Sequence, residues 1–390
     1  MPHIKVKPFD TSILDSLIAT DDIFSFRAIA NRGDDELLGV VYEDEPFMLE
    51  IKKRAEEYLI KPDTISRPLD VNRIKKLLAL LLSKTDLTLL HSNIALSTTK
   101  PALAQESNKR VEDFQNPLFT KEKVSIEVGF GSGRHLLYQA SKNPDTLFIG
   151  IEIHTPSAQQ VLKQIELQGI DNIWVVNYDA RLLLEMIPSN ICTNIYVHFP
   201  VPWDKKPHRR VISKRFLDES LRVLCVGGEL ELRTDSDKYY AYAIEVFSSH
   251  PKIGFRVEKN QEQAVRSKYE DRWRAQEKDI YTVSVRSDIH SVEPARDYHF
   301  EFGRVVEDID TALFSYETII KDDYFIHFER VYSIVGESKP LVRVAFGSFD
   351  KPEHKYLYQQ GDSLSYYPQN PVQTDVNYRA HKHIEELLNV

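Results

Sequence analysis

The sequence predicts an α/β protein with a mostly parallel central β-sheet and further strand-rich regions on both sides of it in the chain. Three observations indicate this fold class. Residues 121–250 alternate short β-branched runs with segments of helix length, which is typical of βαβ units. A glycine-rich turn follows the first of these runs. From residue 298 onward, aromatic runs have the composition of strands.

The chain of 390 residues is long enough for two or three domains. Its net charge and its pattern of strand-like and helix-like runs change at two places. Residues 1–115 carry 16 basic and 19 acidic side chains and form a predicted N-terminal accessory region. Residues 116–290 carry 24 basic and 23 acidic side chains and contain the βαβ alternation. Residues 291–390 carry 10 basic and 17 acidic side chains and form a predicted acidic, aromatic-rich α+β domain. The net charge of −9 therefore comes largely from the last hundred residues, and a polyanion can still bind the central part.

The elements follow from the periodicity of each region. In residues 1–115, LLGVVY and LTLLHSNIAL are predicted strands, VNRIKKLLALLL is a predicted amphipathic helix, and residues 98–110 are a predicted linker. In the central region the predicted parallel strands are VSIEVGF, LFIGIEI, NIWVVNY, NIYVHF and GGELELRTD, and GFRVEK and IYTVSVRS are expected to close the sheet as an antiparallel pair. Beyond them come the predicted strands YHFEFGRVV, YFIHFERVYSIV and LVRVAFGSF, a hairpin turn at GESKP and a final helix, YRAHKHIEELLNV.

Several classes of protein are disfavoured by the composition. Cys192 and Cys225 are the only cysteines, and neither has a neighbour at metal-ligand spacing, which argues against a disulfide scaffold and a zinc site. The longest apolar run, residues 77–82, is too short to cross a bilayer, and MPHIKVKPFD lacks the pattern of a secretion signal. We expect a cytoplasmic protein with no membrane segment and no metal.

The run VSIEVGFGSGRHLL predicts a strand, a tight turn and a helix. Gly129, Gly131 and Gly133 occupy alternate positions, where they let the backbone turn sharply and approach a ligand. The dinucleotide fingerprint requires glycine at the position of Arg134, so NAD is disfavoured. Glu127 ends the strand and would repel a diphosphate, but it would attract a ligand with a cationic amine in its tail. S-adenosylmethionine is such a ligand.

Two further acids close the next two strands. Glu152 follows the glycine loop at about the 20-residue spacing at which an acidic side chain meets a ribose diol. Asp179 ends the third strand, where it can reach an adenine amino group. Each acid also has a simpler explanation: Glu127 can be a surface carboxylate, and Asp179 can cap the helix that follows. Three acids at successive strand ends favour one nucleoside site.

Residues 116–286 resemble the tRNA (guanine-N7)-methyltransferase family, a class I methyltransferase with a Rossmann-like fold. The matching pieces are IEVGFGSG, GIEIH, the strand end at Asp179, FPVPWDKKPHRR, LRTD and SKYE. The Pro-x-Pro-Trp loop with its lysine and the late Lys-Tyr-Glu are far more specific than the glycine loop. The resemblance covers under half of the chain.

The resemblance implies roles for individual residues. Glu127, Glu152 and Asp179 would bind S-adenosylmethionine. Contacts to tRNA would come from Lys205, Asp235, Ser267, Lys268, Tyr269 and Glu270; the family usually has Thr-Lys-Phe-Glu in the last run, so Ser267 and Tyr269 keep the hydroxyl and the ring. The serious departure is Val201, where the family has an aspartate assigned to the active site. Asp204 is the candidate catalytic replacement.

The loss of that aspartate is compatible with methylation of guanine N7, because N7 carries an in-plane lone pair and no proton. No general base is obligatory, and the site must instead align the lone pair with the methyl group and tolerate charge on the base. Asp235 and Glu270 are natural acceptors for the N1–H and N2 amino donors of guanine.

The basic residues Lys206, Arg209 and Arg210 are predicted to bind tRNA phosphates, the alternative being a solvated surface. Trp203 either stacks on a base or plugs the loop. The predicted function is methyl transfer from S-adenosylmethionine to N7 of a guanine in tRNA. Two alternatives are an amino-group methyltransferase, which needs a polar residue where Val201 stands, and a tRNA-binding protein that has lost catalysis.

Overall fold

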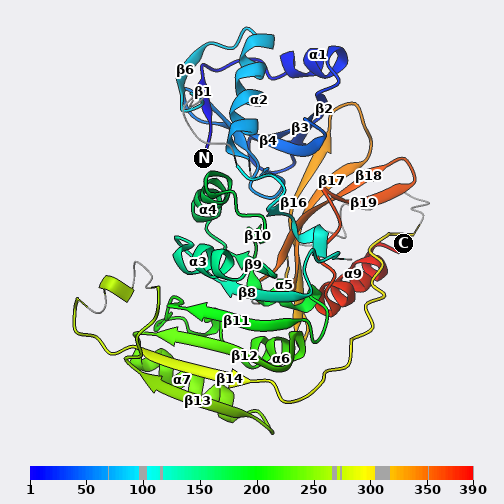
Figure 1. Cartoon of the computed structure of the whole chain (residues 1–390). Helices are drawn as coiled ribbons and strands as arrows, with labels where there is room; N and C mark the ends of the chain where they lie inside the picture. The colour runs from blue at the N-terminus through cyan, green and yellow to red at the C-terminus, as the bar shows by residue number, and fades with distance from the viewer. Residues whose placement is uncertain are drawn as a thin grey trace. The chain divides into compact units, whose positions relative to one another are not determined.

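A computed structural model describes residues 1–68, 70–95, 103–114, 117–265, 270–272, 275–303, 317–349 and 351–389. Its contacts divide the chain into two compact units (Figure 1). We call Lys100–Arg296 the central unit, and Met1–Thr99 together with Asp297–Val390 the accessory unit. The predicted N-terminal and C-terminal regions thus contribute to one unit, except for residues 100–115 and 291–296, which lie in the central unit.

The central unit contains a sheet whose described strands follow the order β13-β14-β12-β11-β8-β9-β10-β7. Its members are β7 (Asn108–Lys109), β8 (Lys123–Val128), β9 (Thr146–Ile151), β10 (Ile173–Val176), β11 (Cys192–His198), β12 (Leu224–Thr234), β13 (Gly254–Lys259) and β14 (Tyr281–Arg286). The strands from β7 to β12 pair in parallel, and β14 and β13 complete the sheet as antiparallel strands. The predicted mostly parallel sheet with a terminal antiparallel pair is confirmed.

One part of this sheet was assigned incorrectly. β7 lies within the predicted linker, yet it pairs with β10. A strand of two polar residues has no periodicity of its own, and backbone pairing alone places it in the sheet.

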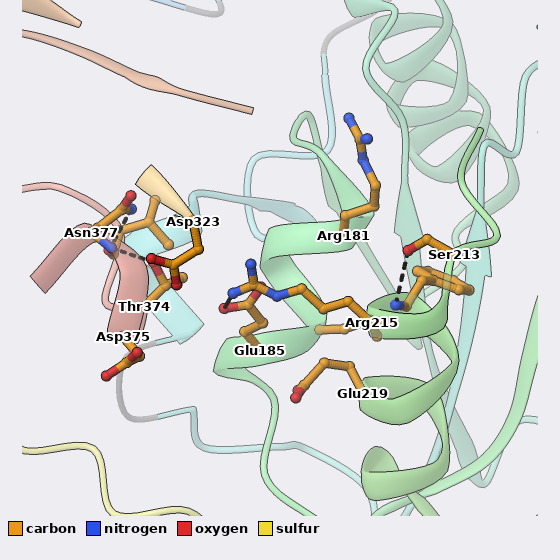
Figure 2. Close-up of polar contacts among 12 residues, drawn as sticks. Arg181, Glu185, Ser213, Arg215, Glu219, Asp323, Thr374, Asp375 and Asn377 are labelled. Carbon is orange, nitrogen blue, oxygen red and sulfur yellow. Dashed lines mark hydrogen bonds and ion pairs between the residues drawn. The ribbon is translucent and has the colours of Figure 1, made fainter. Parts of the chain in front are cut away.

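The helices of the central unit begin and end at local signals. They are η1 (Val111–Phe114), α3 (Arg134–Lys142), α4 (Thr155–Gln168), α5 (Ala180–Met186), η2 (Pro207–Arg209), α6 (Lys214–Val223) and α7 (Asp237–Ser248). Ser213 caps α6 by accepting a hydrogen bond from the backbone N–H of Phe216 at 3.2 Å (Figure 2). α4 ends at Gly169, whose φ of 63° is the left-handed conformation that glycine adopts readily.

The two faces of the sheet differ in chemistry between β8 and β12. Ile195 pairs with Ile126 and Leu230 in the neighbouring strands, and all three side chains are fully buried. One position further along, Tyr196 pairs with Glu127 and Glu231, so the opposite face carries a row of polar side chains. Parallel sheets are usually apolar on both faces because helices cover both. A polar row at this depth therefore indicates a functional role.

The accessory unit contains a second sheet with the order β19-β18-β17-β16-β2-β3-β4-β5-β1-β6, in which β15 also pairs with β16. Its strands are β1 (Ile4–Val6), β2 (Phe24–Ala30), β3 (Asp35–Tyr42), β4 (Glu45–Lys53), β5 (Tyr58–Pro62), β6 (Leu89–Ser92), β15 (Ile319–Ile320), β16 (Tyr324–Ile334), β17 (Pro340–Ser348), β18 (Glu353–Gln360) and β19 (Ser363–Tyr367). The pairing of Ser333 with Ile29 joins the two ends of the chain in this sheet.

Three apolar clusters stabilise the described part of the accessory unit, and one of them joins β2, β3 and β4 to β16, β17 and β18. The other two pack helices against the sheet. One packs α1 (Ile13–Thr20) and α2 (Val71–Lys84) against β1 to β5. The other packs α9 (Asp375–Leu388) against β16 to β19. The predicted amphipathic helix, the hairpin turn between β16 and β17 and the final helix are confirmed.

Candidate functional site

The glycine loop after β8 provides open space beside its backbone. Gly129, Gly131 and Gly133 have φ of 70°, 54° and 72°, which only glycine adopts without strain. A Cβ atom on Gly129 would meet nothing within 4 Å, and one on Gly131 would meet only the carbonyl oxygen of Gly129 at 4.0 Å. Gly133 differs, because a Cβ there would lie 2.4 Å from the side chain of Val161 in α4. The first two glycines leave room for a ligand, and the third allows helix packing.

Glu152 follows β9 and is held against the glycine loop. Its Oε2 accepts a hydrogen bond from the backbone N–H of Gly131 at 2.9 Å, and its Oε1 accepts one from the N–H of His154 at 2.9 Å. The residue is 8% exposed. A carboxylate has about four acceptor positions, so both oxygens keep capacity for a ribose diol.

Asp179 caps the N-terminus of α5, which is the simpler of the two explanations that its position in the sequence allows. It accepts a hydrogen bond from the backbone N–H of Arg181 at 3.0 Å at the start of α5, and it forms an ion pair with the guanidinium of the same residue. Contact between Asp179 and a cofactor stays a prediction.

Glu127 is buried and belongs to a polar cluster under the loop. Its Oε2 lies 2.8 Å from Nδ1 of His135, the second residue of α3, and Glu127 is 3% exposed. The His135 ring contacts the His198 ring with centroids 4.6 Å apart, and Nε2 of His198 lies 2.7 Å from Oε1 of Glu231. Tyr196 packs edge-on against His135 at 4.8 Å. Two carboxylate–imidazole pairs thus meet at the ends of β8, β11 and β12.

Burial and charge act in opposite directions on these groups. Burial lowers the pKa of His135, but the charge and hydrogen bond of Glu127 outweigh burial, and the pKa lies above its usual range. Burial also lowers the pKa of His198, and there it prevails over the hydrogen bond to Glu231, aided by the neighbouring His135. Of the two histidines, His135 therefore keeps a proton to the higher pH.

The loop after β11 is held in a strained conformation. Phe199 and Trp203 have φ of 50° and 46°, unusual for residues that carry side chains. The backbone N–H of Phe199 donates to the carbonyl oxygen of Arg233 at 2.7 Å. Val201 is 60% exposed and Trp203 36%. The family that residues 116–286 resemble has an aspartate at this position, and here it is a solvent-accessible valine.

The basic residues of this loop separate into two kinds. Arg210 is 7% exposed, donates to the carbonyl oxygen of Pro202 at 2.8 Å, lies 3.5 Å from Asp204 and covers the Tyr242 ring at 4.5 Å. Lys205, Lys206 and Arg209 are exposed. Arg209 covers the Trp203 ring at 5.3 Å. Arg210 thus holds the loop together from inside, and Arg209 and the lysines present charge to solvent.

The two predicted base-contacting acids differ in their surroundings. Asp235 follows β12 and forms an ion pair with Lys278 at 2.9 Å. Glu270 is fully buried, and its two oxygens accept from the guanidinium of Arg233 at 2.9 and 3.1 Å. Ser267, Lys268 and Tyr269 lie outside the described residues.

Sequence reasoning did not single out His135, His198, Glu231 and Arg233 as site residues. A signal was present, because polar residues alternate with aliphatic ones at the ends of β11 and β12 in YVH and ELELR. Such alternation on a central strand indicates a face that helices do not cover with apolar side chains.

Some further properties of the described residues bear on the site. No helix among them is long and apolar enough to cross a membrane. Over the same ranges, no group of three or more His, Cys, Asp or Glu side chains is arranged to hold a metal ion. Cys192 and Cys225 are free thiols.

Known proteins are similar to this chain over most of its length. Residues 121–283 match a family model described as a putative methyltransferase. The tRNA (guanine-N(7)-)-methyltransferase of Wolinella succinogenes is 41% identical over 363 residues, which cover 91% of each chain. The protein of the same name from Campylobacter fetus subsp. fetus is 38% identical and covers 94% of each chain. That from Helicobacter acinonychis is 37% identical and covers 89% of this chain and 87% of its own.

Proposed function

This chain belongs to the tRNA (guanine-N(7)-)-methyltransferase family, and we propose that it transfers a methyl group from S-adenosylmethionine to N7 of a guanine in tRNA. The observation that carries this function is the similarity at 41% identity over 91% of both chains, which includes the accessory unit as well as the central one. The geometry of the central unit supports it, because the acids at the ends of β8 and β9 lie beside a glycine loop with open space.

The residues present fit the cofactor. Glu152 would accept from the ribose hydroxyls, Glu127 would meet the amine of the amino-acid tail, and Gly129 and Gly131 would let the nucleoside approach the backbone. When bound, the cofactor supplies a methyl group on a positively charged sulfur. The lone pair of N7 would accept that methyl group, and the sulfur would keep the electron pair of the bond that breaks.

Asp235 is the acid best placed to hold the guanine. Its ion-pair partner Lys278 is exposed, so a base can displace that lysine or share the carboxylate with it. Glu270 has both oxygens engaged by Arg233. We therefore propose that Asp235 accepts from the Watson–Crick edge of guanine, and that Glu270 positions the end of β12 through Arg233.

Methyl transfer here rests on alignment of the base. Val201 cannot accept a proton, and Asp204 is ion-paired with Arg210. Because N7 loses no proton, the reaction needs neither as a base. We propose that the exposed Lys205, Lys206 and Arg209 bind phosphates of the tRNA, and that the protein acts in the cytoplasm, where tRNA is found.

The decisive experiment incubates the purified full-length protein with unmodified tRNA and methyl-labelled S-adenosylmethionine and identifies the labelled nucleoside. The expected product is 7-methylguanosine. Label in an exocyclic amino group would show an amino-group methyltransferase instead. Cofactor binding without transfer to any tRNA would show a binding protein that has lost catalysis. The matched variant Asp235→Asn should lower kcat/KM by roughly 5- to 150-fold, the effect of losing one base-edge contact.

A further inference from the structure

We propose that Lys278 is a further specificity-determining residue, whose ammonium group donates to O6 of the guanine while the N1–H and N2 amino group of that base donate to Asp235. The inference deepens the proposed function and rests on it, because it takes Asp235 to hold the target base. It supplies a protein partner for the acceptor on the Watson–Crick edge of guanine, next to the two donors of that edge.

The position of Lys278 is set by the pairing of two strands. Thr234, the last residue of β12, pairs with Tyr281, the first residue of β14, so the segment after β12 and the segment before β14 lie side by side. Asp235 follows β12 directly, and its Oδ2 lies 2.9 Å from Nζ of Lys278. The Lys278 and Asp235 side chains are 41% and 17% exposed. The ion pair is therefore at the end of the sheet and can be reached by a ligand.

The backbone beside Lys278 is held by Asn260, the residue after β13. The side-chain oxygen of Asn260 accepts from the backbone N–H of Ile280 at 2.8 Å, and its backbone N–H donates to the carbonyl oxygen of Ile280 at 2.8 Å. Its side-chain amide donates to Asp279 at 2.9 Å. These bonds fix the segment from which the Lys278 side chain extends, so its ammonium group has a set place relative to Asp235.

A carboxylate beside an ammonium group presents an acceptor next to a donor. The edge of guanine has the complementary order, because the N1–H donor is adjacent to the O6 acceptor. An ammonium group has three N–H donors, so bonds to Asp235 and to O6 can coexist. In RNA, bases that are turned out of the stack are read on these edges.

The same pair disfavours adenine, the other common base that has a lone pair on N7. Adenine has an N1 lone pair where guanine has N1–H, and an amino group where guanine has O6. The carboxylate of Asp235 would face the lone pair, and the ammonium group of Lys278 would face an N–H donor. Adenine is therefore mismatched at both groups, and the ion pair selects guanine.

The charge of Lys278 determines how the contact enters the kinetics. Methylation leaves a positive charge on the base, and a neighbouring ammonium group disfavours that charge. The bond to O6 therefore stabilises the bound, neutral guanine more than the transition state. Lys278→Met should raise KM for tRNA by roughly 5- to 150-fold, the effect of losing one base-edge contact, and should leave kcat unchanged or raise it. Lys278→Arg keeps a charged donor and should restore most of the affinity.

The test compares bases at the methylated position of the tRNA, after that position has been mapped. Full-length protein is given tRNAs that carry guanosine, 2-aminopurine or inosine there, and transfer of labelled methyl groups is measured. 2-Aminopurine lacks O6 and N1–H, and inosine lacks only the N2 amino group. In Lys278→Met, the preference for guanosine over 2-aminopurine should shrink by roughly 5- to 150-fold. The preference over inosine should persist, because the N2 amino group meets Asp235.

The matched control is Lys259, which forms an ion pair with Asp279 at 2.6 Å, with the two side chains 51% and 45% exposed. Lys259→Met should leave KM and both preferences unchanged. An equal loss of preference in this variant would show a general effect of charge and overturn the proposal.

Two further outcomes would also overturn the role of Lys278. One is an undiminished preference for guanosine over 2-aminopurine in Lys278→Met. The other is a slope of log K against log salt that falls by about one in this variant while both preferences stay unchanged, which would assign Lys278 to a phosphate. Each of these outcomes leaves the proposed function intact. That function fails only if the unaltered protein forms no 7-methylguanosine.

Discussion

The ion pair between Arg233 and Glu270 provides a test of whether Glu270 contacts the substrate or supports the site. Both side chains are essentially buried, with exposures of 2% and 0%, and two hydrogen bonds join them. Removing one partner of such a pair leaves an uncompensated buried charge, which typically costs about 3–5 kcal/mol. Glu270→Gln should lower the free energy of unfolding of the central unit by that amount, equivalent to about 6–20 °C in Tm for a unit of this size.

The assay combines denaturant unfolding with tRNA methylation kinetics well below the melting temperature. A pair with apolar replacements on both sides, Arg233→Met with Glu270→Met, should recover most of the stability lost in Glu270→Gln. The matched control is the neighbouring Asp271, which pairs with Arg134 at 3.3 Å with both side chains 52% exposed. Asp271→Asn should cost less than about 1 kcal/mol.

A specific result would refute this reasoning. If Glu270→Gln leaves stability unchanged and lowers kcat/KM for tRNA, Glu270 contacts the substrate. Its ion pair with Arg233 then contributes little to the stability of the central unit. If stability falls and kinetics at low temperature are nearly unchanged, Glu270 acts as a support for the end of β12.

Four further predictions follow from other contacts. Glu152→Gln removes the charge that accepts from the Gly131 N–H and should weaken S-adenosylhomocysteine binding by about 1.5–3 kcal/mol in calorimetry. Arg209→Glu should weaken tRNA binding and reduce the slope of log K against log salt, and cofactor affinity should stay unchanged. Burial raises the pKa of Glu185 to about 7 although Arg215 opposes this (Figure 2), so the folded state binds its proton more tightly than the unfolded state. The free energy of unfolding should therefore fall as pH rises from about 4.5 to 7, by up to about 3 kcal/mol, and Glu185→Gln should remove this slope in denaturant titrations. Val201→Asp should leave the rate of tRNA methylation unchanged or raise it modestly.

Each of these expectations has an outcome that contradicts it. Undiminished affinity in Glu152→Gln would remove this carboxylate from the cofactor site. A salt slope unaffected by Arg209→Glu would place tRNA on another surface. A pH slope that persists in Glu185→Gln would assign it to another group. A large loss of activity in Val201→Asp would show that the exposed valine has a role that a carboxylate cannot fill.

Much of the central fold was predictable because its determinants are local. Alternating β-branched runs and helix-length segments indicated the parallel strands, and the antiparallel pair at β13 and β14 was expected from the strand-like runs GFRVEK and IYTVSVRS. The acids Glu127 and Glu152 could be placed because the carboxyl ends of parallel strands meet at one edge. Pairing between distant segments was not predictable: Ser333 joins Ile29 across three hundred residues, which local periodicity does not encode.

The sequence by itself determined the type of site, through the spacing of glycines and strand-end acids and through the Pro-x-Pro-Trp loop. The tertiary structure decided how individual side chains in it are used. Arg209 and Arg210 are adjacent and chemically identical, yet one lies over Trp203 in solvent and the other is buried against Pro202 and Tyr242. Burial depends on what the rest of the fold places around a residue. For that reason, composition and spacing can locate a charged cluster and cannot say which of its charges face a ligand.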